Sequence, residues 1–267
     1  MFKEFYSLAR EPFSKELKEA DFFNTQSFSE ALARLHYLKK VRGIGVLTGE
    51  TGAGKTSALR CFAGNLNAAL FKVVYFPLST GTVMDFYRGL VKGLGLEPRF
   101  RKVDLFHQIQ EGVYTLFKEK RITPVFILDE MHMASPKFLA DLSIIFNFKM
   151  DSVNPFVLIL AGMPHLLSSL TLNQNQSLNQ RVLMRYKMEP LNQDEVKRYI
   201  NHHLEIAGAK HTIFSEAAIE AISSRSRGWP RMINNIAVTS MLYGAQLQVE
   251  NICPDVVKKA IEDIDTE

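Results

Sequence analysis

Cysteine, tryptophan and long apolar runs are scarce in this chain of 267 residues. It has two cysteines, Cys61 and Cys253, and a single tryptophan. Two cysteines form neither a disulfide framework nor a zinc site by themselves, so we expect a reduced, cytoplasmic protein. The longest nearly apolar run, residues 156–163, is far shorter than the roughly 20 residues that a membrane-spanning helix needs. The sequence therefore predicts no membrane segment.

A signal peptide, an internal repeat and an extreme charge are missing as well. The first fifteen residues carry five charged side chains and no apolar core, which argues against a secretory leader. The 32 basic residues exceed the 28 acidic ones by four, a balance compatible with nucleic acid as a partner but too small to indicate one. Hydrophobic residues make up 46% of the chain, so we expect a globular fold.

Short β-rich runs alternate with longer amphipathic stretches up to Pro190, and only helical stretches follow. This alternation predicts parallel βαβ units, hence an α/β domain over residues 1–190, with an all-helical domain over residues 191–267. The predicted strands are 44–48, 72–77, 124–128, 155–161 and 186–189, and the predicted helices are 55–70, 82–94, 105–118, 137–148, 192–207, 215–224, 230–247 and 254–264.

A glycine-rich motif follows the first predicted strand. It reads Gly49, Glu50, Thr51, Gly52, Ala53, Gly54, Lys55 and Thr56, with Ser57 next, and matches the full phosphate-loop pattern between a strand and a helix. Glycines let backbone N–H groups converge on phosphate oxygens, and the helix that follows adds its positive end. The motif predicts a bound nucleotide, with Lys55 on the β- and γ-phosphates and the Thr56 hydroxyl on Mg²⁺. The alternative is a glycine-rich turn with a chance lysine.

Two adjacent carboxylates end the apolar strand 125–128. Asp129 is predicted to hold Mg²⁺, and Glu130 to orient and polarise the attacking water. The alternative is that the pair only caps the next helix. This pair favours an ATP hydrolase over a GTPase switch or a small-molecule kinase. The letters DEMH resemble a helicase motif, but the chain has no room for a second such domain, and we expect His132 to be a helix-start residue.

At this point the chain resembles the AAA+ ATPases, in particular the ExeA/GspA-type ATPases and the transposon-helper ATPases such as TnsC, the phage Mu B protein and IstB. The similar segments are FYSLAREPFS, EALARLHYLKKVRGIGVLTGETGAGKT, LAGMPHL, QRVLMRYKMEPLNQDEVKRYINHHLEIAG and SRGWPRMINNIA. The resemblance implies a parallel five-stranded sheet of order 5-1-4-3-2 with a C-terminal helical lid. It also implies nucleotides held between subunits of a ring or helical filament.

The resemblance gives roles to two arginines. Arg231, in the segment GWPR, matches the sensor 2 arginine that contacts the γ-phosphate from the lid. Its neighbours agree with this position, since Gly228 is expected to end one helix and Pro230 to begin the next. Arg181 matches the position of an arginine finger that reaches the ATP of a neighbouring subunit, with Arg185 as the competing candidate.

One position departs from the family pattern. The sensor 1 site, after the strand 155–161, usually carries a polar residue, whereas this chain has Met163 there and no polar side chain before His165. A weak sensor would hold the attacking water poorly. We therefore expect slow hydrolysis, which suits a switch better than a motor.

Basic residues near position 100 suggest a DNA surface. Arg99, Arg101 and Lys102 surround Phe100, at the position where the transposon helpers track DNA. A second basic cluster contains Lys118, Lys120 and Arg121, diluted by Glu119. Such cations can hold phosphates without reading bases. The alternative is a solvated loop between helices.

Two functions remain open from the sequence. ExeA-type proteins carry a membrane segment and a wall-binding region after the ATPase domain, and we expect neither here. The sequence therefore favours an ATP- and Mg²⁺-dependent regulator of transposition that assembles on duplex DNA and works with a DDE-type transposase. The alternative is an ExeA-like ATPase of secretion or envelope assembly that binds no DNA. A metabolic kinase fits poorly, because no substrate-pocket motif is recognisable.

Overall fold

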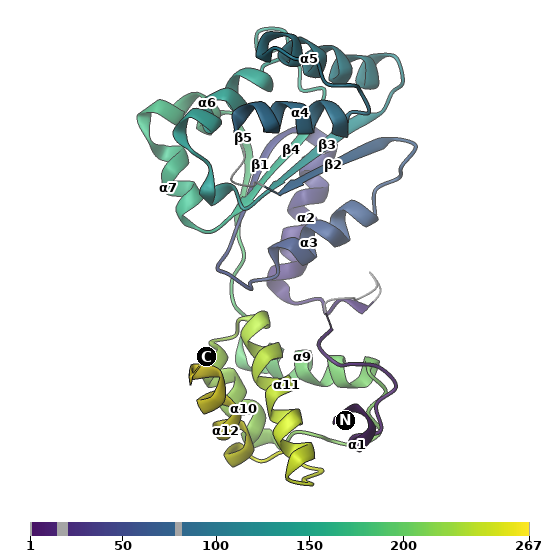
Figure 1. Ribbon diagram of the computed structural model, residues 1–267, viewed down its shortest axis with the longest axis vertical. Coiled ribbons are helices and arrows are strands. Elements are labelled where there is room, and N and C mark those ends of the chain that lie inside the picture. The colour runs from purple at the N-terminus through teal and green to yellow at the C-terminus, as the bar shows by residue number, and fades with distance from the viewer. Residues whose placement is uncertain (1, 15–20, 78–81, 267) are drawn as a thin grey trace. The chain divides into compact units, whose positions relative to one another are not determined.

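The computed structural model describes residues 2–14, 21–77 and 82–266 of the chain (Figure 1). The chain forms two compact units, each with its own hydrophobic core. The sheet unit consists of Glu30–Glu50 and Lys55–Met188, and the helical unit consists of Met1–Ser29, Thr51–Gly54 and Glu189–Glu267.

The sheet unit is built on five parallel strands in the order β2-β3-β4-β1-β5. The strands are β1 (Gly43–Thr48), β2 (Phe71–Pro77), β3 (Thr123–Asp129), β4 (Val157–Gly162) and β5 (Val182–Lys187). β1 and β4 are buried along their whole length, as expected for strands covered on both faces. The predicted α/β class and the order 5-1-4-3-2 are confirmed.

Helices cover both faces of this sheet. In Figure 1, α2 and α3 lie on the face opposite to α4 and α5. The helices are α2 (Gln26–Val41), α3 (Lys55–Gly64), α4 (Val83–Gly93), α5 (Lys102–Lys118), α6 (Pro136–Ile145), α7 (His165–Thr171) and α8 (Gln176–Gln180), and two short 3₁₀ helices, η2 (Met131–Met133) and η3 (Asn173–Asn175), lie between them.

No helix in the described residues has the length and apolar character to cross a membrane.

The fifth strand was predicted in the wrong place. The expected range was 186–189, whereas β5 occupies Val182–Lys187. β5 is an edge strand, and its side chains alternate between buried Val182 and Met184 and exposed Leu183 and Arg185. This alternation of apolar and mixed positions is a weaker signal than the continuous apolar runs of the central strands.

The helical unit contains α1 (Phe2–Phe5), α9 (Gln193–Ile206), α10 (Glu216–Ser226), α11 (Pro230–Gln246) and α12 (Pro254–Thr266). The helices α9 to α12 begin at or next to the polar or proline residues predicted for their starts. Asn192 caps α9 in a capping box with Glu195, Ser215 caps α10, and Pro230 is the first residue of α11.

The N-terminal segment is part of the helical unit. The Tyr6 ring is fully buried in its core, and the Tyr6 hydroxyl donates to the carbonyl oxygen of Val249 at 3.0 Å. The backbone N–H of Ala9 donates to the carbonyl oxygen of Ala207, and that of Gln26 to Glu195 Oε1. The compact units therefore differ from the expected division at residue 190, because apolar side chains near the N-terminus pack with the helices after Glu189.

Candidate functional site

The phosphate loop connects β1 to α3, in the strand–loop–helix context that the motif requires. Lys55 is the first residue of α3, and only 8% of its surface is exposed. Its Nζ donates to the carbonyl oxygens of Gly49 at 2.8 Å and Glu50 at 3.0 Å. The ammonium group is thus held inside the loop, where a phosphate group would find it, and the alternative of a chance lysine on the surface does not fit this burial.

Asp129 lies at the end of β3 and is almost completely buried. Its Oδ2 accepts from the Thr56 hydroxyl at 3.0 Å and from the Tyr75 hydroxyl at 3.3 Å, and its Oδ1 accepts from the backbone N–H of Glu130 at 2.9 Å. The two residues predicted to hold Mg²⁺, Thr56 and Asp129, are therefore in direct contact. A hydroxyl and a carboxylate are the oxygen ligands that Mg²⁺ prefers, so this pair fits the metal of a nucleotide site.

Tyr75 was not expected in the site. It lies on β2, next to β3, and its hydroxyl reaches Asp129. Desolvation of the phenol oxygen raises the pKa of Tyr75 to about 12, and the charge of Asp129 and the hydrogen bond to it, then the charge of Glu130, act in the same direction. Half of the residue is nevertheless exposed, so we attribute the shift to the enclosed hydroxyl end. The tyrosine is a neutral hydrogen-bond donor to Asp129 at physiological pH.

Glu130 differs from the neighbouring Asp129 in its backbone conformation and its exposure. Its backbone has φ 57° and ψ 30°, the left-handed region that non-glycine residues rarely adopt, and half of its side chain is exposed. Glu130 occupies the N-cap position of η2, yet its side chain makes no capping hydrogen bond. The alternative that Asp129 and Glu130 merely cap a helix therefore receives no support, and the strained residue points to a functional role.

One histidine lies next to Glu130, and a second lies against the first. Nδ1 of His132 is 3.3 Å from Glu130 Oε2, within ion-pair distance but without hydrogen-bond geometry. The His165 ring meets the His132 ring edge to face at 5.1 Å, and its Nε2 is 3.3 Å from the His132 carbonyl oxygen. His132 lies within η2, as expected of a residue near a helix start, but it also contacts the predicted catalytic carboxylate.

Met163 directly follows β4, at the position of the expected sensor 1. A thioether has no hydrogen to donate to a water or a phosphate. The imidazole of His132 lies beside Glu130 and contacts the His165 ring. Gly162 leaves room for the backbone of η2, because a Cβ added there would lie 2.9 Å from the backbone nitrogen of His132.

Arg231 lies in the first turn of α11, after Pro230, as predicted. Its backbone N–H donates to the carbonyl oxygen of Gly52 at 3.3 Å, and both residues belong to the helical unit. Gly52 has φ 80°, and a Cβ at Gly52 would lie 2.5 Å from the Cβ of Arg231. Only glycine fits this position, for its conformation and for its contact. The sensor 2 role of Arg231 remains a prediction.

The two candidate arginine fingers differ in their surroundings. The Arg181 guanidinium donates to the carbonyl oxygens of Ser143 and Phe146 and pairs with Asp151, and 13% of its side chain is exposed. Arg185 is exposed on β5, where its guanidinium donates to the backbone and side-chain oxygens of Asn179. Arg185 also donates to the carbonyl oxygen of Val182 at 3.5 Å, so both guanidinium groups have three acceptors. Arg181 differs in its burial and in its ion pair with Asp151, which makes Arg185 the freer of the two to reach another subunit.

The predicted DNA segment is held by carboxylates of its own chain. Lys102 Nζ is 2.6 Å from Oδ1 of buried Asp141, and Arg101 pairs with Asp104 at 3.2 Å. The Arg99 backbone N–H donates to the side chain of Gln108. Phe100 is 85% exposed. Two of the three cations therefore already have an anionic partner.

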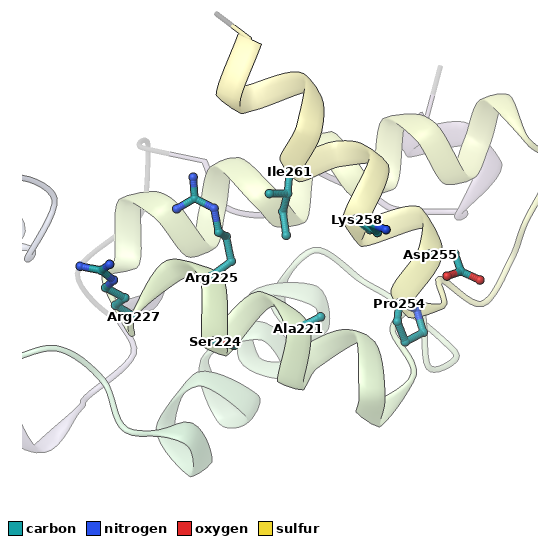
Figure 2. A pocket seen from close by; sticks show the side chains of 8 residues that line it. All are labelled: Ala221, Ser224, Arg225, Arg227, Pro254, Asp255, Lys258 and Ile261. Atoms are coloured by element: carbon teal, nitrogen blue, oxygen red, sulfur yellow. The ribbon is translucent and has the colours of Figure 1, made fainter.

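A hollow of about 530 Å³ opens on the helical unit between α10 and α12 (Figure 2). Arg225, Arg227 and Lys258 lie at its rim together with Asp255, and Ile261 points toward Ala221 between the two helices. Arg225 also pairs with Asp265. None of the predicted site residues lines this hollow, so it is separate from the nucleotide chemistry.

Comparisons with known proteins agree with this geometry. The family model for an AAA domain matches residues 38–170, which contain the phosphate loop and the Asp129–Glu130 pair. The chain carries an AAA-type P-loop ATPase domain. ATP hydrolysis is the activity expected of this family, and the AAA+ part of the sequence-based resemblance is confirmed.

One curated relative and several solved structures are similar to this chain. General secretion pathway protein A of Aeromonas hydrophila is 29% identical over 247 residues, covering 91% of this chain and 44% of that protein. The chain thus spans less than half the length of this relative. The similarity supports the ExeA/GspA-type resemblance, while the transposon-helper resemblance stays a prediction.

Among solved structures, Cdc6p of Pyrobaculum aerophilum has a TM-score of 0.73 at 17% identity, covering 94% of this chain and 70% of that one. The ORC1 protein of Aeropyrum pernix in complex with DNA has a TM-score of 0.68 at 15% identity, covering 91% and 66%. The RuvB branch migration motor of Thermotoga maritima has a TM-score of 0.60 at 19% identity, covering 90% and 70%. At these identities the likeness shows the fold.

Proposed function

We propose that this chain hydrolyses ATP at the carboxyl ends of β1 and β3. The contact between Thr56 and Asp129, beside the enclosed ammonium group of Lys55, is the observation that carries the proposal. The loop from Gly49 to Gly54 would surround the phosphates with backbone N–H groups, Lys55 would neutralise the β- and γ-phosphates, and Thr56 and Asp129 would hold Mg²⁺. Ser57 follows Thr56 in the first turn of α3 and belongs to the same cradle.

Glu130 is the group that we assign to the attacking water. Its carboxylate is exposed and uncommitted to capping, and it is adjacent to the metal ligand Asp129. A carboxylate there can accept a hydrogen bond from the water and draw the oxygen toward the γ-phosphate. Met163, at the expected sensor 1 position, has no hydrogen to donate to this water, which supports slow turnover.

Two arginines complete the proposed chemistry. Arg231 would place a positive charge on the γ-phosphate from the first turn of α11. Arg181 or Arg185 would act on the ATP of a neighbouring subunit in a ring or helical filament, which makes hydrolysis depend on assembly.

We further propose that ATP controls the binding of duplex DNA, without sequence preference, by a cytoplasmic oligomer that regulates a DDE-type transposase. The likeness in fold to the ORC1 protein, whose structure contains DNA, supports the DNA part. ATP binding would stabilise the subunit interface, and assembly would add many weak phosphate contacts into strong binding.

A second candidate is an ATPase of secretion or envelope assembly that binds no DNA. The 29% identity to General secretion pathway protein A over 91% of this chain favours it. The two candidates share the ATPase site and differ in the partner.

Phosphate release and duplex binding, measured on one preparation, test these proposals. The ATPase proposal predicts Mg²⁺-dependent phosphate release that is lost in Lys55→Ala, and unchanged release in that variant would refute it. The DNA proposal predicts that fluorescence anisotropy of a labelled duplex rises only with an ATP analogue. Equal affinity for the duplex with and without the analogue, or no duplex binding at all, would favour the secretion candidate.

A further inference from the structure

The amino-terminal edge of the sheet, opposite to the phosphate loop, collects seven basic side chains. They lie at the end of α2, at the end of α5, and in the connections that lead into β1, β3 and β4. We call this set the basic edge; it consists of Lys39, Lys40, Arg42, Lys118, Lys120, Arg121 and Lys149. Glu119 is the acidic residue within the α5 part of the set.

Aromatic rings of α5 hold three of these cations. The Arg42 guanidinium lies 4.6 Å from the centre of the Phe117 ring, and Lys118 Nζ lies 5.9 Å from the same ring. Lys149 Nζ lies 5.1 Å from the centre of the Tyr114 ring, one turn earlier on α5. A hydrogen bond to Lys149, then the charges of Lys149 and Lys118, lower the pKa of Tyr114.

The α2 part of the set joins the same surface. Lys39 Nζ lies 5.7 Å from the ring of Phe71 at the start of β2. The residue before Phe71, Leu70, accepts a hydrogen bond from the backbone N–H of Thr123, which starts β3 just after Arg121. The cations of α2 and those of α5 therefore lie along neighbouring strand ends, and an extended ligand can touch both.

Carboxylates do not neutralise the basic edge. Within residues 2–14, 21–77 and 82–266, none of the seven cations forms an ion pair, and the nearby Asp151 pairs with Arg181. The Arg99–Lys102 segment differs, because Asp104 and Asp141 already hold two of its cations. The basic edge is thus the better surface for an external anion.

Two arginines of the set adopt the left-handed conformation. Arg42 has φ 61° and Arg121 has φ 57°, each between the end of a helix and the start of a strand. Glycine would fill such positions without strain. A long basic side chain at both turns suggests that the charge serves a purpose.

We propose that the basic edge is the surface by which this chain holds the phosphate backbone of duplex DNA without reading its sequence. This proposal rests on the DNA-binding part of the proposed function and names its contact surface. A duplex presents a regular row of phosphates, which an extended row of cations can match. An anionic membrane is the weaker fit, since membrane-surface binding favours the apolar face of an amphipathic helix, whereas these cations lie at helix ends and in connections.

The location separates the two ligands of the chain. The phosphate loop and Asp129 lie at the carboxyl ends of the strands, whereas the basic edge lies at their amino ends. Bound DNA would not compete with ATP for Lys55. Control by ATP would instead come from assembly, which aligns the basic edges of many subunits along one duplex.

The test removes four exposed cations in the full chain by changing Lys40, Lys118 and Lys120 to Gln and Arg121 to Asn, because Asn tolerates the left-handed conformation. A matched control removes four exposed cations of the helical unit by changing Arg198, Lys210, Lys258 and Lys259 to Gln. Each protein is titrated with a labelled duplex in the presence of an ATP analogue, at several salt concentrations. Phosphate release without DNA reports whether each variant is folded and active.

The edge variant should lose roughly 10²–10³-fold in affinity at about 0.1 M salt, and its salt slope should fall by about 3 to 4, since each phosphate contact contributes about 0.9. The control and an Arg99→Gln/Arg101→Gln variant should bind as the unchanged protein does. If the unchanged protein binds duplex and the edge variant binds equally well, the surface is wrong while the function stands.

Absence of duplex binding by the unchanged protein in every nucleotide state would overturn the proposed DNA function itself. A last arm uses vesicles with about 30% phosphatidylserine, an anionic surface of the kind that attracts basic residues. If the edge variant loses vesicle binding but keeps duplex binding, the basic edge is a membrane surface and the proposal is overturned.

Discussion

The two edges of the sheet use charge in opposite ways. At the carboxyl edge, charged groups are held by hydroxyl and backbone groups, since Asp129 accepts three hydrogen bonds and Lys55 donates to two carbonyl oxygens. At the amino edge, cations lie on aromatic rings such as Phe117 and Tyr114. A few fixed charges suit a compact anion held at one place for chemistry, whereas a row of unpaired cations suits a long anion held along its length.

The largest expected effect concerns the arginine that we propose acts between subunits. An arginine finger contributes about 10³–10⁵-fold to the rate. Because Arg185 is exposed and Arg181 is held by Ser143, Phe146 and Asp151, Arg185→Ala should lower turnover by that order without lowering the melting temperature. Arg181→Ala should instead lower the melting temperature.

Mixing experiments can check whether the finger acts on the neighbouring subunit. An Arg185→Ala protein mixed with a Lys55→Ala protein should regain part of the activity, where an intact pocket meets an intact arginine. If Arg181→Ala stays fully stable and loses turnover while Arg185→Ala remains active, Arg181 is the finger. A rate per subunit that does not depend on protein concentration would contradict action between subunits.

The next effect in size concerns Glu130. Glu130→Gln should reduce turnover by about 10²–10⁴-fold, the usual contribution of a general base, while ATP still binds because Thr56 and Asp129 are unchanged. Single-turnover phosphate release and calorimetry measure the two quantities separately. Duplex binding at the amino edge should persist in this variant with ATP. Loss of both turnover and duplex binding in Glu130→Gln would contradict separate roles for the two edges.

Much of the nucleotide site could be predicted from the sequence, because each of its parts is local. The phosphate loop is one continuous motif, and Asp129 directly follows an apolar strand. Tyr75 could not be found this way, since only the pairing of β2 with β3 brings its hydroxyl to Asp129. The ion pair that occupies Lys102 could not be predicted for the same reason, because Asp141 is 39 residues from Lys102 in the sequence.

The free energy of unfolding should depend on pH through a buried histidine of the helical unit. His203 is buried against Phe13 and Tyr199. Burial, then the charges of His202 and Arg10, lower the pKa of His203 to about 4 from 6.5. Its depressed pKa means that the unfolded chain takes up the proton first, so stability is complete above about pH 6.5 and falls toward pH 4, by on the order of 3 kcal/mol.

Equilibrium unfolding of the unchanged protein and of His203→Leu between pH 4 and pH 7 measures this contribution. The stability difference between the two proteins should change with pH in that window. A substitution of the exposed His211 by Leu is the control and should leave the pH dependence as it was. Parallel pH profiles for the unchanged protein and His203→Leu would contradict the assignment.

The smallest expected effect concerns Lys102. Lys102→Met keeps the length of the side chain but leaves the buried carboxylate of Asp141 with the Tyr87 hydroxyl alone. We expect a loss of about 1–2 kcal/mol in the free energy of unfolding, reduced because part of Lys102 is exposed. Arg101→Ala, which removes an exposed pair, should cost less than about 0.5 kcal/mol. A tenfold loss of duplex affinity in Lys102→Met at unchanged stability would indicate that the Arg99–Lys102 segment contacts the DNA.

Two features of the fold have only weak or distant signals in the sequence. The edge strand β5 alternates between buried and exposed side chains, so its start was missed by four residues, at Val182 instead of Tyr186. The basic edge was seen only as its α5 part, since Arg42 and Lys149 join Phe117 and Tyr114 through the fold.

The central claim is that the phosphate loop binds ATP through the enclosed ammonium group of Lys55, and calorimetry with a non-hydrolysable ATP analogue and Mg²⁺ tests it most directly. The account predicts one bound nucleotide per chain, with binding lost in Lys55→Ala and retained in Glu130→Gln. Equal affinity of Lys55→Ala and the unchanged protein for the analogue would contradict it.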